Sequence, residues 1–325
     1  MDRRNFIQKT AAFTGGLLVP KLLTASFPAL PAKSRIVISH NASWSRSVGT
    51  VDSDSMLKVL DKAIQTYFQV DHVRQGWSKI VRPGEVIGLK VNCLSGHGAT
   101  HTLLVQAVAE RLQQAGIKEN DIIVWDRLNS DLEDGGFRIN YGKKGLRVFG
   151  NDAIGFDPYL QTFGQASSLV TKILTRVVDG VINLPLLKDH SIAGITMSLK
   201  NLFGAINNPN KYHLNTGDPY IADVNRLPAI YHKVRFTICD AAQAQYHGGP
   251  SFMPQWRWPF GALIVGRDRV AMDYTGWKII EQKRAKMGFK SLKEEGREPT
   301  YISTAADASH ALGTNDPQRI DVIRV

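Results

Sequence analysis

Hydrophobic and polar positions along the chain follow two alternating patterns. Short apolar runs rich in β-forming residues predict strands at 35–40, 85–92, 121–126, 146–151, 178–187, 234–240 and 261–266. Between several of these runs, apolar residues recur at helical spacing, over 55–69, 102–116 and 272–287. Runs such as VINLPLL are apolar at every position, as in strands that are covered on both faces. The chain therefore predicts an α/β fold, with a mostly parallel sheet and helices on both of its faces.

The turn-rich stretch 207–220 (NNPNKYHLNTGDPY) interrupts this alternation. A long stretch without regular structure in a compact domain is typically a functional loop. No internal repeat or linker divides the remainder. We therefore expect a single large domain over 33–325, with 207–220 as a lid or part of a small sub-lobe.

The first 32 residues have the pattern of an export signal. Arg3 and Arg4 precede a moderately apolar stretch with a Gly-Gly pair, which is typical of a twin-arginine signal peptide over 1–32. Lys21 interrupts the apolar run well short of the ~20 residues that a membrane span needs. We expect export to the periplasm by the twin-arginine translocation machinery. The alternative is a cytoplasmic protein whose first helix begins with two arginines.

Composition and charge narrow the classes of function. The 325 residues are 43% hydrophobic and 21% charged, which is typical of a globular protein. The net charge of +11 falls to +8 without residues 1–32, and basic and acidic residues alternate over 278–298 as on a solvated helix face. No motif of a nucleic-acid-binding protein is present. We expect no nucleic-acid partner and, because no other segment is apolar over a sufficient length, no stable membrane span.

Polar residues of particular types stand at the ends of the predicted strands. They are Lys90, Asn92, Lys188, His190, Asp240 and Asp268, with Lys200, Asn201 and Arg226 in the segments nearby. In open parallel sheets, ligands bind beyond the carboxyl ends of the strands. A lysine buried there is costly unless it meets a carboxylate or a ligand anion. Cations outnumber acids at these positions, so we expect a site for an anionic small molecule, with Asp240 and Asp268 as the nearest counter-ions. A structural network of salt bridges is the alternative.

The junction over 85–116 contains a glycine-containing loop before a helix. Backbone N–H groups at a helix start can bind an anion, although the GHG sequence at 96–98 matches neither a phosphate loop nor a dinucleotide motif. Histidines here and farther along the chain are candidates for a metal site. They are His97, His101, His190 and His213. Gly98 argues against a shared helix face for His97 and His101.

Several segments occur in a recognisable order over roughly 82–320. They are PGEVIGLKVN, ATHTLLVQAVAERLQQAG, VINLPLLKDH, SLKNLFGAI, DVNRLPAI, FTICDA, GGP and RDRVAMD. This order resembles an uncharacterised bacterial and archaeal family, known as domain of unknown function 362. The positions that match the family pattern are Lys90, Asn92, His101, Lys188, His190, Lys200, Asn201, Asp223, Asn225, Arg226, Asp240, Gly248, Gly249, Pro250, Asp268 and Asp273. The resemblance implies no established reaction.

Many relatives in that family carry ferredoxin-like cysteine clusters and are labelled iron–sulfur proteins, and twin-arginine signals are common among them. This chain has only Cys93 and Cys239, so we expect no self-contained iron–sulfur cluster. Both cysteines follow predicted strands. They form either one disulfide, in an oxidising compartment, or two buried or site-lining thiols.

These observations leave three hypotheses for function. The first is an exported, redox-linked or other enzyme that acts on an anionic small molecule, with a cofactor or metal inserted before export. In it, Lys188 and Lys200 hold the anion, His190 or His101 moves a proton near its ordinary pKa, and Asp240 orients the histidine. The second is a non-catalytic periplasmic binding or maturation protein for an anionic ligand or metal. The third is a metal protein in which the four histidines are ligands.

Overall fold

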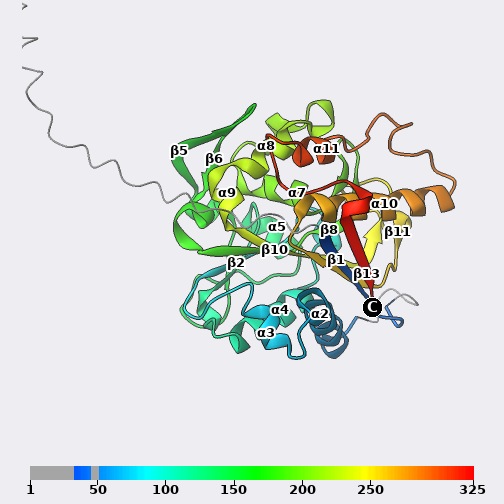
Figure 1. Cartoon of the computed structure of the whole chain (residues 1–325). Coiled ribbons are helices and arrows are strands. Elements are labelled where there is room, and N and C mark those ends of the chain that lie inside the picture. The colour runs from blue at the N-terminus through cyan, green and yellow to red at the C-terminus, as the bar shows by residue number, and fades with distance from the viewer. Residues whose placement is uncertain (1–32, 45–50) are drawn as a thin grey trace, which may run out of the picture. The chain divides into compact units, whose positions relative to one another are not determined.

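The structure is a computed structural model that describes residues 33–44 and 51–325 (Figure 1). The predicted export signal at 1–32 lies outside the described residues. Each of the seven predicted strand runs contains a strand of one large sheet. The strands of this sheet are β1 (Ser34–His40), β2 (Ile87–Lys90), β3 (Ile122–Trp125), β4 (Arg147–Val148), β7 (Gly180–Asn183), β8 (Leu186–His190), β9 (Gly194–Thr196), β10 (Val234–Gln245), β11 (Arg257–Trp258), β12 (Ala262–Gly266) and β13 (Ile320–Arg324).

The directions of the strands decide which loops meet at which edge of the sheet. Along its main path the order is β13-β1-β12-β10-β7-β2-β3-β4. β10, β7, β2, β3 and β4 run parallel to one another, and β12 runs antiparallel to its neighbours β1 and β10. The prediction of a mostly parallel sheet is confirmed. Because β12 is reversed, the residues that follow it lie at the edge opposite to those that follow β2, β3 and β7.

Two of the apolar runs form strands with other limits than predicted. The run at 178–187 is divided into β7 and β8, because the chain turns at Leu184 and Pro185 and β8 then pairs with the far half of β10. β10 itself continues for five residues past Asp240, so Asp240 lies within a strand rather than at its end. A separate hairpin of β5 (Phe156–Phe163) and β6 (Ala166–Thr171) was not predicted.

Helices cover both faces of the large sheet, as predicted (Figure 1). Along β1, Val37 packs into one hydrophobic core with α2, α3 and α4, and Ile36 and Ile38 pack into a second core with α7, α8, α10 and α11. Successive strand residues point to opposite faces, so each continuously apolar strand contributes to both cores. The helices are α2 (Ser53–Phe68), α3 (Val73–Trp77), α4 (Thr102–Gln114), α5 (Asn129–Asp134), α6 (Asn151–Ile154), α7 (Ser198–Asn201), α8 (Tyr220–Arg226), α9 (Pro228–Lys233), α10 (Arg269–Lys286) and α11 (Tyr301–Ala306).

Local sequence explains where the two longest helices, α2 and α10, begin. Asp52 precedes α2 and accepts a hydrogen bond from the backbone N–H of Ser55 at 2.8 Å, while the Ser55 hydroxyl interacts with the backbone of Asp52. Such a cap contributes about 1 kcal/mol. Asp268 does the same for α10 by accepting from the N–H of Ala271 at 2.8 Å. This capping hydrogen bond is a sufficient structural role for Asp268, without any role in a ligand site.

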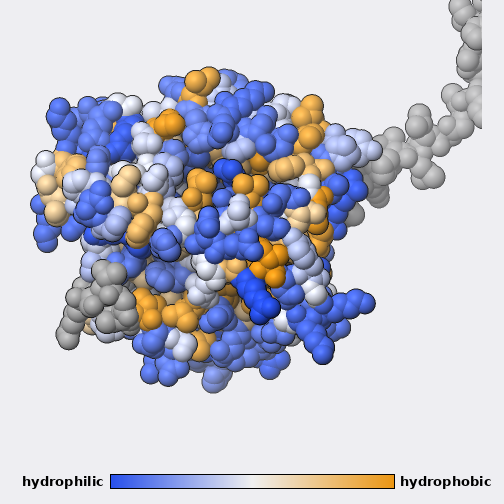
Figure 2. All heavy atoms as spheres, turned by 180° about the vertical axis from the view of Figure 1, so that it is seen from behind, coloured by the Kyte–Doolittle hydropathy of each residue, from blue (hydrophilic) through white to orange (hydrophobic). Residues whose placement is uncertain are grey.

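On the face shown in Figure 2, hydrophilic residues cover most of the surface, with smaller hydrophobic groups between them. Large exposed apolar side chains include Leu94, the adjacent Tyr159 and Leu160 of β5, and Leu214. Among the described residues, no helix combines the length and the apolar character that a membrane span requires.

Candidate functional site

A pocket of about 340 Å³ lies beyond the carboxyl ends of β2 and β3, beside β8 and α7. We call it the lysine pocket. Its charged and polar lining includes Lys90, Asn92, Asp126, Arg127, Lys188, His190, Lys200, Asn201 and His213. The structure thus brings together most of the residues predicted to bind an anion. Pro209, Asn210 and His213 come from the predicted loop at 207–220, which does border the pocket.

Lys90 is the one lysine of this pocket whose charge a described carboxylate compensates. Its Nζ lies 2.7 Å from Oδ1 of Asp126, and both side chains are buried. Asp126 also accepts the backbone N–H groups of Cys93 and Arg127, at 2.7 and 2.8 Å. The counter-ion is therefore Asp126, at the end of β3, and not Asp240 or Asp268. This ion pair joins the ends of two neighbouring strands and forms the floor of the pocket.

Lys188 and Lys200 form no ion pair within the described part of the chain. The residue Lys188 is only 4% exposed. Its Nζ donates hydrogen bonds only to neutral oxygens, namely Oδ1 of Asn92 at 3.1 Å, the Ser95 hydroxyl at 3.0 Å and the carbonyl of Pro250 at 3.2 Å. Burial lowers the pKa of Lys188 to about 8. Burial and the charge of Lys188 together lower the pKa of Lys200 to about 7. The charges of Asp126 and Asp189 favour the ammonium form of Lys188, but burial outweighs them, and no described carboxylate pairs with either lysine.

A row of side-chain amides fixes the orientation of the groups around Lys188. The amide N–H₂ of Asn92 donates to Asn201 at 2.9 Å, Asn201 donates to Asn183 at 2.8 Å, and Asn183 donates to the carbonyl of Ser198 at 2.9 Å. In this order every amide oxygen accepts from the preceding residue, and Oδ1 of Asn92 faces Lys188. All three asparagines are buried, so the row is a rigid wall of the pocket.

The two histidines of the pocket are held in different tautomers. Nδ1 of His190 accepts the backbone N–H groups of Ile192 and Ala193, each at 3.1 Å, so in this ring the proton is on Nε2. Nδ1 of His213 donates to the carbonyl of Pro209 at 3.0 Å, so its Nε2 accepts from Nζ of Lys200 at 2.9 Å. The rings stack with centroids 5.6 Å apart.

The sequence had led us to expect that His190 titrates near its ordinary pKa. In the structure its pKa is far from that value. Burial, followed by the charge of Lys200, lowers the pKa of His190 to about 2. The two N–H groups that point at Nδ1 would also oppose protonation there. His190 is thus a neutral hydrogen-bond donor at Nε2 rather than a proton carrier at neutral pH.

Asp273 of α10 positions α7, the short helix that carries Lys200 and Asn201. Asp273 is fully buried and accepts the N–H groups of Ser198 and Leu199, at 2.7 and 3.2 Å, at the first turn of α7. Burial raises the pKa of Asp273 to about 8. Gly276, one turn farther along α10, packs against Met197 with no room for a Cβ, so α10 and α7 are in close contact.

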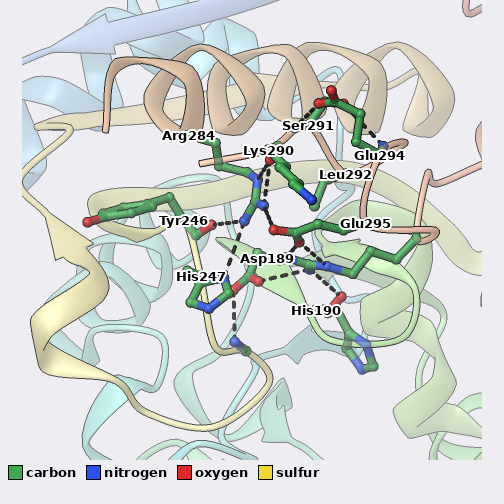
Figure 3. A network of polar contacts seen from close by, with 12 residues as sticks. Asp189, His190, Tyr246, His247, Arg284, Lys290, Ser291, Leu292, Glu294 and Glu295 are labelled. Atoms are coloured by element: carbon green, nitrogen blue, oxygen red, sulfur yellow. Dashed lines mark hydrogen bonds and ion pairs between the residues drawn. The ribbon is translucent and has the colours of Figure 1, made fainter. Parts of the chain in front are cut away.

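A network of charges, buried except for Glu295, contacts β8 through Asp189 and the carbonyl of His190 (Figure 3). Arg297 donates to Oδ2 of Asp189 and to the carbonyl of His190, both at 3.1 Å. Oδ1 of Asp189 accepts the N–H of Gly249 at 2.8 Å, next to Pro250, whose carbonyl contacts Lys188. The network therefore determines where Lys188 and His190 point, although none of its charges lines the pocket.

The expectation that 278–298 is a solvated face is confirmed for most of its charged residues, among them Lys286, Lys293 and Glu294, but not for Arg284. Arg284 of α10 is fully buried, forms an ion pair with Glu295 at 2.5 Å and donates to the carbonyl groups of Tyr246 and Lys290 (Figure 3). Glu295 also pairs with Arg297 at 2.6 Å. A charged residue in an alternating pattern can be buried when its partner returns from a later loop, which a local pattern does not show.

His101 and Asp240 lie outside the lysine pocket. Oδ2 of Asp240 accepts both the backbone N–H of His101 at 2.8 Å and its Nδ1–H at 2.7 Å. His101 lines a second pocket, of about 590 Å³, together with His97, Gln243 and Arg257. We call this the His101 pocket. The segment between β2 and α4 separates it from the lysine pocket, and the two share no lining residue.

Two of the predicted ligand-binding residues belong to neither pocket. Asp268 follows the reversed strand β12, and there it accepts from the hydroxyl of Ser34 and from the N–H of Thr314 at 3.0 Å. Arg226 lies over the ring of Tyr231, with its guanidinium carbon 4.1 Å from the centroid, and over Phe163. Both predictions assumed that every strand and loop end faces one edge of the sheet.

The four predicted metal ligands do not converge. His97 and His101 line one pocket, and His190 and His213 line the other. Throughout 33–44 and 51–325, no group of three or more His, Cys, Asp or Glu side chains is placed to hold a metal ion. Cys93 and Cys239 are free thiols, both buried, so the alternative of a disulfide is wrong for this structure. Burial raises the pKa of each thiol.

Sequence reasoning missed several residues that build the site. Asp126 is the last residue of the third predicted strand and Arg127 follows it, so the strand-end rule could have selected both. Asp273 was a position of the family pattern without an assigned role. Arg297, in contrast, lies in a charged loop far along the chain, and nothing in the local sequence relates it to β8.

The fold and the pocket define an α/β protein with a cation-rich pocket at the carboxyl ends of parallel strands. Residues 87–278 match the model of the family described as "Domain of unknown function (DUF362)", and the chain belongs to this family. It is 26% identical to a thylakoid-associated protein (sll1697) of Synechocystis sp. over 258 residues, which cover 72% of this chain and 75% of that protein.

The chain also matches a solved structure of a Thermotoga maritima protein. The two are 12% identical, with a TM-score of 0.40, and the match covers 73% of this chain. This chain matches 59% of the length of the Thermotoga protein.

Proposed function

We propose that the protein is an exported enzyme that binds and converts an anionic small molecule in the lysine pocket. One observation carries the proposal: Lys188 and Lys200 are buried in one pocket, and no described carboxylate pairs with either of them. A buried ammonium group without a counter-ion destabilises the folded protein, and a carboxylate or phosphate group of a ligand would remove this penalty.

The residues of the pocket suit chemistry as well as binding. Lys200, with a pKa of about 7, exchanges a proton near neutral pH and is placed as the general acid or base. The Nε2–H of His190 is a fixed neutral donor that can stabilise negative charge developing on a substrate oxygen. In this proposal Lys188 binds the anionic group, and Asn92 and Asn201 orient Lys188.

Binding is tested with short carboxylates and phosphate monoesters as probes, by calorimetry at pH 7. We expect at least one probe to bind the wild type, and Lys188→Met and Lys200→Met to weaken that binding by at least about tenfold, as expected for a lost charged hydrogen bond. Lys118→Met is the matched control, because Lys118 is exposed and lines neither pocket. Equal affinities in all four proteins would contradict the proposal.

Turnover separates the enzyme from the non-catalytic binding protein. A probe that binds through Lys188 and Lys200 is incubated with the wild type and followed by mass spectrometry. We expect its conversion to depend on Lys200 more than on Lys188 when both variants are saturated. Tight binding without any conversion would support the non-catalytic protein.

Export is proposed from the pattern of residues 1–32. A fusion of residues 1–40 to a reporter that folds in the cytoplasm should reach the periplasm, and replacing Arg3 and Arg4 by Lys together should stop it. Equal periplasmic amounts of both fusions would contradict this part of the proposal.

A further inference from the structure

The His101 pocket contains polar groups that the fold does not use. Gln243 of β10 is 5% exposed and lines the pocket, and neither its amide nitrogen nor its amide oxygen has a hydrogen-bond partner in the described structure. Two residues farther along the same strand, Gln245 is equally buried, but it donates to the carbonyl of Ser251 at 3.0 Å and accepts the N–H of Met253 at 3.1 Å. A buried amide is normally bonded on both atoms, so Gln243 differs from Gln245 in a way that points to a ligand.

Arg257 is a second group of this kind. It lines the pocket, with its guanidinium carbon 5.1 Å from the ring centroid of Phe252. Its guanidinium forms no ion pair or hydrogen bond with any residue in the described ranges. The buried acid in electrostatic reach is Asp240, which is already bonded to His101. A guanidinium group offers several N–H donors in one plane, an arrangement that fits a carboxylate or phosphate.

His101 supplies the third donor. Because Asp240 holds the Nδ1–H, the ring is oriented and Nε2 is its remaining polar atom. No described residue makes a hydrogen bond to Nε2. Asp240 is the main reason that the pKa of His101 is raised, which favours the form that carries a proton on Nε2. The acids of this pocket, Glu133 and Asp134, are on its exposed side.

We propose that the His101 pocket is a second ligand site, which binds a carboxylate or phosphate group of a small molecule through Arg257, Gln243 and His101. Asp240 is a positioning residue, since it acts through His101. The site is separate from the lysine pocket and takes its own ligand, because the two pockets are lined by different residues on either side of the segment that joins β2 to α4.

The test uses inorganic phosphate and succinate in separate titrations, which distinguish a phosphate from a carboxylate site. The readout is the ring resonance of His101 in NMR spectra, together with calorimetry. In Lys200→Met, we expect one of the two probes still to bind and to shift this resonance. Relative to Lys200→Met, the variant Arg257→Gln should bind that probe at least about tenfold more weakly. His101→Asn, which keeps a donor to Asp240 and removes Nε2, should do the same. If neither probe shifts the His101 resonance, or if both variants bind as Lys200→Met does, the second site is refuted.

A pair of variants on one strand separates a ligand site from a structural role. Gln243→Leu removes two unpaired buried atoms, so we expect an unchanged or raised midpoint of urea unfolding together with weaker binding of the probe. Gln245→Leu breaks two hydrogen bonds, so we expect a lowered midpoint. A midpoint lowered equally in both variants would show that Gln243 is bonded within the protein and would overturn the proposal.

Discussion

Nζ of Lys200 lies 2.9 Å from Nε2 of His213, in a pocket that it shares with Lys188 and where no described carboxylate pairs with either lysine. The imidazole is neutral there, because its Nε2 accepts a hydrogen bond from Lys200 and burial lowers the pKa of His213. A neutral acceptor stabilises an ammonium group far less than a carboxylate would. The protonation of Lys200 is therefore tied both to the stability of the fold and to the presence of an anion.

The first prediction concerns the pH dependence of stability. The pKa of Lys200 is about 7 in the folded protein and ~10.4 in an unfolded chain. Between these values the unfolded chain binds the proton and the folded protein does not. The free energy of unfolding should thus rise with pH, by up to about 1.4 kcal/mol per unit for this group. Lys188, with a pKa of about 8, adds to the rise above pH 8.

Urea unfolding at pH 7, 8 and 9 measures this rise. In Lys200→Met, the part of the rise due to Lys200 is absent, so the wild type should gain stability relative to the variant as the pH increases. If the free energies of unfolding of the two proteins changed with pH in parallel, the pKa of Lys200 would not be lowered in the folded protein.

The second prediction separates the two nitrogens of His190. His190→Ala leaves the N–H groups of Ile192 and Ala193 without their acceptor, which should cost about 1–3 kcal/mol of unfolding free energy. His190→Asn places an amide oxygen near Nδ1 and should cost less. Both variants lose Nε2–H, so both should convert substrate more slowly. Equal stability of the two variants in urea would mean that Nδ1 is not the acceptor.

The third prediction concerns the pair of Arg297 and Asp189. Both side chains are largely buried, so Arg297→Met should lower the free energy of unfolding by about 3 kcal/mol. In a double-mutant cycle with Asp189→Asn, the two changes should be less than additive. The matched control is Arg176→Met, since Arg176 pairs with Asp157 but is 53% exposed, and its loss should cost less than about 1 kcal/mol. Additive effects at Arg297 and Asp189 would contradict a direct pair.

The fourth prediction concerns the thiols. Cys93 and Cys239 are buried and their pKa values are raised, so neither should react with a thiol reagent at pH 8 in the folded protein. In urea without a reductant, both should react. Protein isolated from the periplasm that shows no free thiol in urea would instead contain a disulfide, and the packing around both residues would have to differ.

Much of the fold could be predicted because its pattern is local. The apolar runs at 85–92 and 121–126 contain β2 and β3, and helical spacing over 55–69 and 272–287 corresponds to α2 and α10. Alternation of side chains along a strand and the 3.6-residue period of a helix depend only on neighbouring residues. The strand-end rule then selected Lys90, Asn92 and Lys188, which line one pocket.

The predictions that failed concern direction and pairing. Asp268 follows a strand as Lys90 does, but β12 is antiparallel, so Asp268 lies at the other edge of the sheet. Asp240 was placed at a strand end, yet β10 continues to Gln245. Hydrophobic periodicity does not state which way a strand runs or how far its partner extends.

The sequence by itself therefore determined many of the elements, the two-sided burial of the sheet and the basic character of its carboxyl edge. Only the tertiary structure decided which charges are compensated: Asp126 neutralises Lys90, whereas Lys188 and Lys200 have no described carboxylate partner. It also divided the candidate histidines between two pockets. The physical reason is that electrostatic compensation acts over a few ångströms between residues far apart in the chain, and strand order and direction set those distances.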